Sequence, residues 1–152
     1  MDFFNYIKTG NIAEVKRCIE VDPSIVNRND PRGFTPLVMA TYTDQVEIAK
    51  YLITHGTKIN AQDGVGNTAL MGVCFKGNIA MVEMLLAEGS NVNIQNHQNS
   101  TALIYAATFG HKAVVELLLN AGADKDLKDN KGNTAKSSAK LKGSKDIVDL
   151  LV

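Results

Sequence analysis

A glycine-rich segment and three histidines are the residues of this sequence whose types suggest chemistry. Gly64-Val65-Gly66-Asn67-Thr68-Ala69 has the letters of the dinucleotide-binding fingerprint Gly-x-Gly-x-x-Gly/Ala. That fingerprint needs a preceding parallel strand, a following helix and an acidic residue about 20 positions later. Because segments of similar sequence recur along the chain as a turn, we do not predict a nucleotide site here.

The histidines do not form a metal-binding or catalytic pattern. His55 ends a predicted helix, where a partial positive charge is favourable, and His97 falls at a predicted hairpin tip. Neither they nor His111 has a His or Glu partner at i, i+4, and no cysteine cluster accompanies them. No local catalytic motif is present. We therefore predict no metal, no cofactor and no enzymatic activity.

Composition and charge are those of an ordinary globular protein without an electrostatic preference. Of the 152 residues, 45% are apolar and 21% are charged, and 16 basic residues balance 16 acidic ones. No net charge attracts the chain to nucleic acid or to an anionic membrane. No segment approaches the roughly 20 apolar residues of a membrane span. We predict neither nucleic acid nor membrane as a partner.

Several local features favour a cytoplasmic protein. The N-terminus has an acid where a signal peptide has lysine, and no apolar run follows. Cys18 and Cys74 sit at unrelated spacings and are expected to be small, buried apolar residues in a reducing compartment. Asn99-Ser100-Thr101 spells a glycosylation sequon, which is idle without secretion. The lysines of 125–145 alternate with aspartates, which indicates a solvated face.

An internal repeat sets the register of the chain. Its clearest copy is Gly66-Asn67-Thr68-Ala69-Leu70, and the corresponding threonines recur every 33 residues, at Thr35, Thr68, Thr101 and Thr134. A fixed period of this length is typical of stacked supersecondary units. Each threonine is suited to cap the N-terminus of a short helix, and Pro36 suits the first helical position.

Each unit then continues with a second helix and a polar loop. Its apolar stripe is exemplified by Val114, Val115, Leu118 and Leu119. Asp44, with Glu47 three residues later, is expected to form a capping box for the second helix of its unit. Asx-containing dipeptides in the polar loops predict tight turns or hairpin tips. The glycines that follow the second helices are expected to end them in a left-handed conformation, and they are Gly56, Gly89 and Gly122.

The order of these motifs resembles the ankyrin repeat. The segments 101–103, 106–107, 110–111, 114–119 and 122–124 read Thr-Ala-Leu, Ala-Ala, Gly-His, Val-Val-Glu-Leu-Leu-Leu and Gly-Ala-Asp. The resemblance covers essentially the whole chain, and is closest to a small, bacterial-type ankyrin-repeat protein. It implies an all-α solenoid of stacked helix-turn-helix units with hairpin-like loops, and it implies a local hydrogen bond for His111. The histidine usual after Thr-Pro-Leu is replaced by Val38, Met71 and Ile104, which substitutes apolar packing for a hydrogen bond.

The resemblance divides a single domain, 1–152, into about five units. Residues 1–30 form an N-terminal capping repeat with a one-residue insertion at Pro23, and 31–63, 64–96 and 97–129 are full repeats. Residues 130–152 form a C-terminal capping repeat, whose lysines face water while Ile147 and Leu151 pack on the neighbouring unit. On this reading the chain is complete and capped at both ends.

The resemblance implies a non-catalytic module that binds a protein through a concave face of hairpin tips and first helices. The residues that we predict to contact the partner are Arg32, Phe34, Tyr42, Val65, Asn67, Phe75, Lys76, His97, Gln98, Tyr105, Phe109 and Lys131. The aromatic residues among them either anchor a partner or pack between helices. The basic members form a mildly basic rim that favours a partner with an acidic stripe.

Two other functions stay open at this point. The chain, expected to be a monomer, is alternatively a dedicated regulator or inhibitor of a single enzyme in a stress or effector pathway, which requires one tight partner. An enzymatic function would require a pocket with convergent titratable groups.

Overall fold

The structure, a computed structural model, describes residues 2–152. Over these residues the chain forms ten α-helices, one short 3-10 helix and no strand. The α-helices are α1 (Phe3–Lys8), α2 (Ile12–Val21), α3 (Pro36–Tyr42), α4 (Val46–Thr54), α5 (Ala69–Lys76), α6 (Ile79–Ala87), α7 (Ala102–Thr108), α8 (Lys112–Asn120), α9 (Ala135–Leu141) and α10 (Lys145–Leu150). The 3-10 helix is η1 (Pro23–Asn27).

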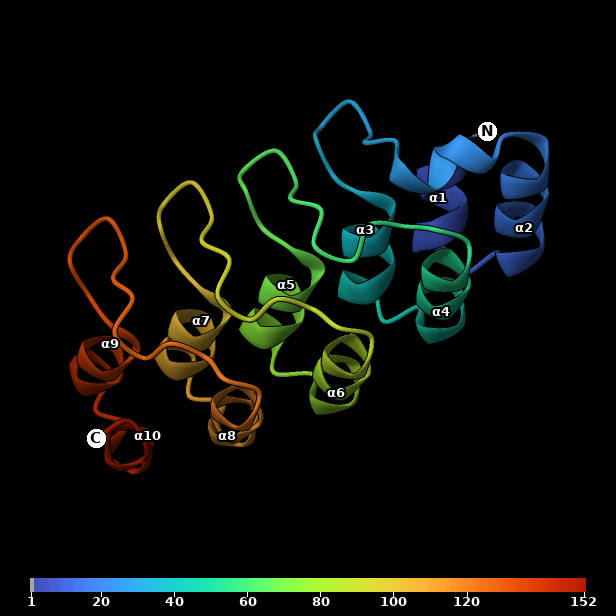
Figure 1. Ribbon diagram of the computed structural model, residues 1–152. Coiled ribbons are helices and arrows are strands. Elements are labelled where there is room, and N and C mark those ends of the chain that lie inside the picture. Colours follow the sequence, from blue (N-terminus) through green and yellow to red (C-terminus); the bar gives the residue numbers. More distant parts are fainter. Residues whose placement is uncertain (1) are drawn as a thin grey trace. The chain divides into compact units, whose positions relative to one another are not determined.

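The helices are arranged in pairs within two compact units. The N-terminal unit is Met1–Ala69 and the C-terminal unit is Leu70–Val152. In the N-terminal unit α1 packs against α2 and α3, and α3 packs against α4 (Figure 1). In the C-terminal unit α7 packs against α8 and α9, while α8 lies beside α6 and α10 (Figure 1). We call α1, α3, α5, α7 and α9 the first helices, and α2, α4, α6, α8 and α10 the second helices.

Threonine caps begin three of the first helices, α3, α7 and α9, as the repeat predicts. The Oγ1 of Thr35 accepts a hydrogen bond of 3.0 Å from Val38 N, and Thr101 and Thr134 make the same bond at the start of α7 and α9. Ser137 returns a bond to Thr134 N, which completes a capping box. Pro36 occupies the first turn of α3, where a missing N–H has no cost. These predictions are confirmed.

The turns on either side of the second helices need a left-handed residue. Gly56, Gly89 and Gly122 follow the second helices with φ of 92°, 91° and 89°, as predicted. The corner between first and second helices has a similar requirement, met by glycine at four of its five occurrences. At the remaining corner the residue is Asp44, with φ of 62°.

The predicted capping box of Asp44 is therefore wrong. The residue that caps α4 is Gln45, whose side chain makes no capping bond. Asp44 lies one residue too early, because the chain needs that position for the left-handed corner. The backbone requirement of the corner prevails over the local capping pattern.

The core of each unit is aliphatic. In the second helices Ile48, Leu52, Val115 and Leu118 are buried, each side chain contributing about 1.5–3 kcal/mol by leaving water. The residues that replace the usual histidine, Val38, Met71 and Ile104, are also buried in the first helices. Apolar packing does substitute for the missing histidine in this chain.

The ends of the chain follow the same plan with fewer apolar residues. In the first helix pair Phe3, Ile7, Val15 and Ile19 are buried, and η1 absorbs the extra residue at Pro23. Ile147 and Leu151 are buried in the last pair, whereas Lys140, Lys142 and Lys145 are exposed.

The two cysteines differ in burial. Cys74 is buried, and desolvation raises the pKa of its thiol well above the usual value, so it behaves as a small apolar residue. Cys18 is only half-buried, so the expectation of burial is met in full by Cys74 alone.

Candidate partner-binding surface

Four loop tips, residues 30–34, 63–67, 96–100 and 129–133, are built in the same way. The first residue of each is Asp30, Asp63, Asn96 or Asp129, and its Oδ1 accepts two backbone hydrogen bonds of 2.9–3.0 Å, from residues i+2 and i+4. The backbone N–H of the first residue also donates to the carbonyl of residue i+4. Each tip is therefore a closed loop held by one Asx side chain.

Neighbouring tips are joined within each unit. In the N-terminal unit Gly64 N donates to Gly33 O at 3.0 Å, and in the C-terminal unit Asn130 N donates to Gln98 O at 2.9 Å. The Nε2 of Gln95 adds a bond of 3.1 Å to Lys128 O. These bonds fix the spacing of the tips, so their outward side chains have defined positions.

A cluster of three aromatic rings lies on the first helices of the C-terminal unit. The Phe75 ring, near the end of α5, packs edge-on against Phe109 at 4.6 Å and against Tyr105 at 6.2 Å between centroids. Phe75 is 39% exposed and Phe109 47%. The Tyr105 hydroxyl accepts a hydrogen bond of 2.8 Å from Asn96 Nδ2, which links the cluster to a tip. The rings pack on one another and still present apolar area to solvent.

The corner beside this cluster is closed by a histidine. His111 Nε2 lies 2.9 Å from Phe75 O, which requires the tautomer protonated on that nitrogen. In the N-terminal unit Gln45 Nε2 donates to Lys8 O at 3.3 Å in the corresponding place. The expectation of a local hydrogen bond for His111 is wrong, because the bond that its ring makes joins two successive helix pairs.

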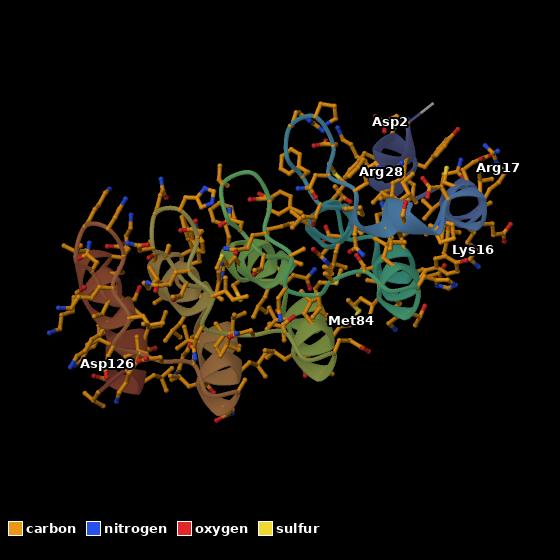
Figure 2. All side chains as sticks on the ribbon, turned by 45° about the horizontal axis from the view of Figure 1, so that its top comes forward. Asp2, Lys16, Arg17, Arg28, Met84 and Asp126 are labelled. Carbon is orange, nitrogen blue, oxygen red and sulfur yellow. The ribbon has the colours of Figure 1, made fainter. Side chains whose placement is uncertain are left out.

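The other two histidines lie where the sequence places them. His97 is an exposed residue of the tip 96–100. His55 ends α4, with its ring stacked on Tyr51 at 3.8 Å and its Nδ1 2.8 Å from Tyr51 O. The ammonium of Lys16, on α2, lies 5.2 Å from the Tyr51 ring on α4. Figure 2 shows Arg17 extending outward from α2.

Three features suggested by residue type or composition can be compared directly with the structure. Residues 2–152 contain no group of three His, Cys, Asp or Glu side chains that could hold a metal ion. The glycine-rich segment 64–69 is a loop tip followed by α5, and no strand precedes it in the described chain. No helix within these residues is long and apolar enough to cross a membrane.

Comparison with known families agrees with this architecture. A family model described as ankyrin repeats (3 copies) matches residues 4–63 and 70–152, and one described as ankyrin repeats (many copies) matches residues 45–86. The chain belongs to the ankyrin-repeat family. No curated protein matches it. Ankyrin repeats are in general protein–protein interaction modules, and the all-α ankyrin-repeat class predicted from the sequence is confirmed.

The predicted contact residues of this ankyrin-repeat protein divide by unit and by exposure. Those in the N-terminal unit are Arg32, Phe34, Tyr42, Val65 and Asn67, and those in the C-terminal unit are Phe75, Lys76, His97, Gln98, Tyr105, Phe109 and Lys131. Phe34, Asn67 and Tyr105 are half-buried, and the others are exposed. Within the units the structure brings together Phe75, Tyr105 and Phe109, and also Arg32 and Phe34, whose guanidinium and ring lie 5.0 Å apart.

Two exposed residues of the ankyrin-repeat surface were missed from the sequence. Leu141, which is 75% exposed, and Lys142 end α9. They stand two repeat lengths after Phe75 and Lys76, so the repeat register of the sequence already indicates that they have equivalent positions. They were overlooked because the last unit was interpreted only as a solvated cap.

Proposed function

We propose that this ankyrin-repeat protein is a non-catalytic module that binds a protein partner through its loop tips and first helices. The observation that carries the proposal is the cluster of Phe75, Tyr105 and Phe109. Apolar rings kept partly in water are unfavourable for an isolated protein, and aromatic residues are enriched at the energetic centres of interfaces.

The surroundings of the cluster support a preformed binding site. Tyr105 is tied to Asn96 and the carbonyl of Phe75 is tied to His111, so the rings have little freedom left to lose on binding. The tips beside them are closed by Asx side chains and by bonds between tips. Rigid anchors next to rigid loops suit recognition of a folded or extended protein segment.

The proposal extends the contact surface over both units. Arg32, Phe34, Tyr42, Val65 and Asn67 occupy, in the N-terminal unit, tips and first-helix ends equivalent to those of the C-terminal unit. On this proposal 1–152 acts as one domain, and residues of both units contact the partner. A monomeric state and a cytoplasmic location belong to the same proposal, and the free thiols of Cys18 and Cys74 support a reducing compartment.

Affinity capture with matched variants tests this function. Bait proteins are the unmodified chain, the triple variant Tyr42→Ala/Phe75→Ala/Phe109→Ala, and a control, Val21→Ala/Tyr51→Ala, that removes apolar area from second helices. We expect a partner to be retained by the first and third baits and lost by the second, with unchanged helical circular dichroism in all three. Equal retention by the triple variant would move the interface elsewhere. One partner at stoichiometric yield would favour a dedicated regulator of that protein.

A further inference from the structure

The net charge differs in sign between the two rows of helices in the C-terminal unit. The first helices of this unit contain no aspartate or glutamate, and they and their C-terminal caps carry Lys76, Lys136, Lys140 and Lys142. Most acidic residues of the unit lie on the second helices and their caps, at Glu83, Glu88, Glu116, Asp146 and Asp149. The second helices also carry Lys112 and Lys145, and the loops carry Asp124, Asp126 and Asp129. The first helices of this unit therefore form a basic row, and its second helices form a row that is acidic on balance.

The tips of the C-terminal unit add to the basic row. Their only acidic residue is Asp129, whose Oδ1 accepts hydrogen bonds from Lys131 N and Asn133 N. His97 and Lys131 are exposed on the same tips. Among the residues that the structure describes, Lys131 and Lys142 form no ion pair, so their charges are available to a ligand.

The same row carries three of the exposed large apolar side chains of the unit, and the others are Ile79 on α6 and Val152. Phe75 and Phe109 form the aromatic pair, and Leu141 stands at the end of α9, next to the exposed Lys142. α9 packs directly against α7, and Leu141 has the repeat position in α9 that Phe75 has in α5, so we assign this leucine to the surface that the cluster begins. Lysines thus follow apolar residues in two of the three first helices, as Phe75-Lys76 and Leu141-Lys142.

We propose that this basic-apolar row, made of α5, α7, α9 and the tips 96–100 and 129–133, binds an acidic peptide segment that carries apolar side chains. The proposal rests on the proposed function and names the chemical class of its partner. The apolar side chains of the segment lie on Phe75, Phe109 and Leu141, and its carboxylates lie near Lys131 and Lys142. Complementary charge of this kind directs the encounter and excludes basic segments.

A peptide suits this row better than the other common polyanion, a nucleic acid. The C-terminal unit has no arginine, the residue that best binds phosphates in two-point contacts. Leu141 offers an apolar surface without the flat ring on which a base stacks. The Phe75 and Phe109 rings already contact each other at a steep interplanar angle of 65°, which blocks continuous stacking of bases.

Selection from a library of random linear peptides, with the full chain as bait, tests the proposal. We expect the enriched peptides to be rich in Asp and Glu and to contain Phe, Leu or Trp. The most enriched peptide, labelled with fluorescein, is then titrated with protein by fluorescence anisotropy. Lys131→Glu/Lys142→Glu should weaken binding about tenfold, whereas Lys50→Glu/Lys112→Glu, the same charge change on second helices, should leave it within about twofold.

The other outcomes separate this inference from the proposed function. Enriched peptides without net negative charge, whose binding Phe75→Ala/Phe109→Ala weakens by about thirtyfold or more, would overturn the acidic class and leave the protein-binding face intact. Absence of enrichment, or peptides indifferent to both double variants, would overturn the inference, and the second result would also contradict the proposed face. A labelled poly-dT strand that bound more tightly than any peptide, with the same variant sensitivity, would replace the peptide by a nucleic acid.

Discussion

The hydrogen bond that links the corner of one helix pair to the preceding pair is made by different side chains in the two units. In the N-terminal unit the flexible amide of Gln45 reaches Lys8 O at 3.3 Å. In the C-terminal unit the planar ring of His111 reaches Phe75 O at 2.9 Å. Both bonds link one helix pair to the next, but only the second ends on a residue of the candidate partner-binding surface.

This difference links stability to the candidate partner-binding surface in one unit and not in the other. His111 fixes the backbone of Phe75, whose ring begins the aromatic cluster, whereas Lys8 has an exposed side chain outside any cluster. The space near the corner also differs. A Cβ added at Gly77 would overlap the His111 ring, and one added at Gly10 would lie 2.8 Å from the mobile Gln45 Oε1.

The largest change in the free energy of unfolding is expected from placing a side chain in the space between Gly77 and the His111 ring. Gly77→Ala should lower the free energy of unfolding by about 3 kcal/mol, because a left-handed alanine costs about 1–2 kcal/mol and displacement of the rigid ring adds a similar amount. Gly110→Ala, with φ of 76° and no atom within 4 Å of the new Cβ, should cost only about 1–2 kcal/mol. Urea unfolding followed by circular dichroism measures both values.

A double variant separates the clash from the backbone strain. In Gly77→Ala/His111→Ala the ring is absent, so the two substitutions should be less destabilising together than the sum of their single effects. Gly10→Ala should fall between Gly77→Ala and Gly110→Ala, because Gln45 can move its amide aside. Equal losses at Gly77 and Gly110 would contradict the idea that the His111 ring is rigidly held.

Much of the fold was predictable because its signals are local and repeated. Thr35, Thr101 and Thr134 each cap a first helix, and Gly56 and Gly122 end second helices in the left-handed region. Each of these residues satisfies a backbone requirement within a few positions of itself. Their identity therefore specifies their role without knowledge of the neighbouring unit.

The failures concern positions at which a second requirement competes. Asp44 and Glu47 have the spacing of a capping box, yet Asp44 occupies the left-handed corner position and Gln45 is the N-cap of α4. The equivalence of Gln45 and His111 was hidden because their partners lie in the preceding helix pair. Contacts between repeats depend on the distance in space between neighbouring helix pairs. The spacing of residues within one repeat does not reveal that distance.

The candidate surface was predictable in position but not in organisation. The repeat register placed Phe75, Tyr105 and Phe109 on first helices, but it left open whether they are exposed or packed. The structure gives both answers, since the rings contact one another and two of them remain exposed. Their contacts depend on the distance between α5 and α7, which the sequence does not encode locally.

An intermediate loss in the free energy of unfolding is expected from removing the side-chain hydrogen bonds of His111 or Gln45. His111→Ala should lower the free energy of unfolding by about 1–1.5 kcal/mol, since it leaves Phe75 O without its partner, and Gln45→Ala should cost about 0.5 kcal/mol because its bond is longer. His111→Gln should recover part of the loss, because Gln45 already performs this role in the N-terminal unit. Urea unfolding measures the three values, and the same proteins can be tested for retention of the partner.

Partner retention by the same variants compares the roles of His111 and Gln45 in binding. His111→Ala should weaken partner retention more than Gln45→Ala does, because only His111 holds a residue of the aromatic cluster. If both variants retained the partner equally while differing in stability, the coupling of His111 to the surface would be excluded.

The smallest change in the free energy of unfolding is expected from replacing two non-glycine residues that have a left-handed backbone conformation, one in each unit. Asp44 has φ of 62° at a corner where other repeats have glycine, and Asn99 has φ of 58° at a tip where Gly33, Gly66 and Gly132 stand in the other repeats. Asp44→Gly should raise the free energy of unfolding by about 0.5–1 kcal/mol, because relief of the left-handed strain exceeds the added entropy of the unfolded chain. Asn99→Gly should gain less, about 0.3 kcal/mol, since asparagine tolerates this conformation better than most residues. Thermal unfolding at matched concentration resolves the order of the two variants, and a loss of stability in Asp44→Gly would mean that the carboxylate contributes more to the corner than its backbone conformation costs.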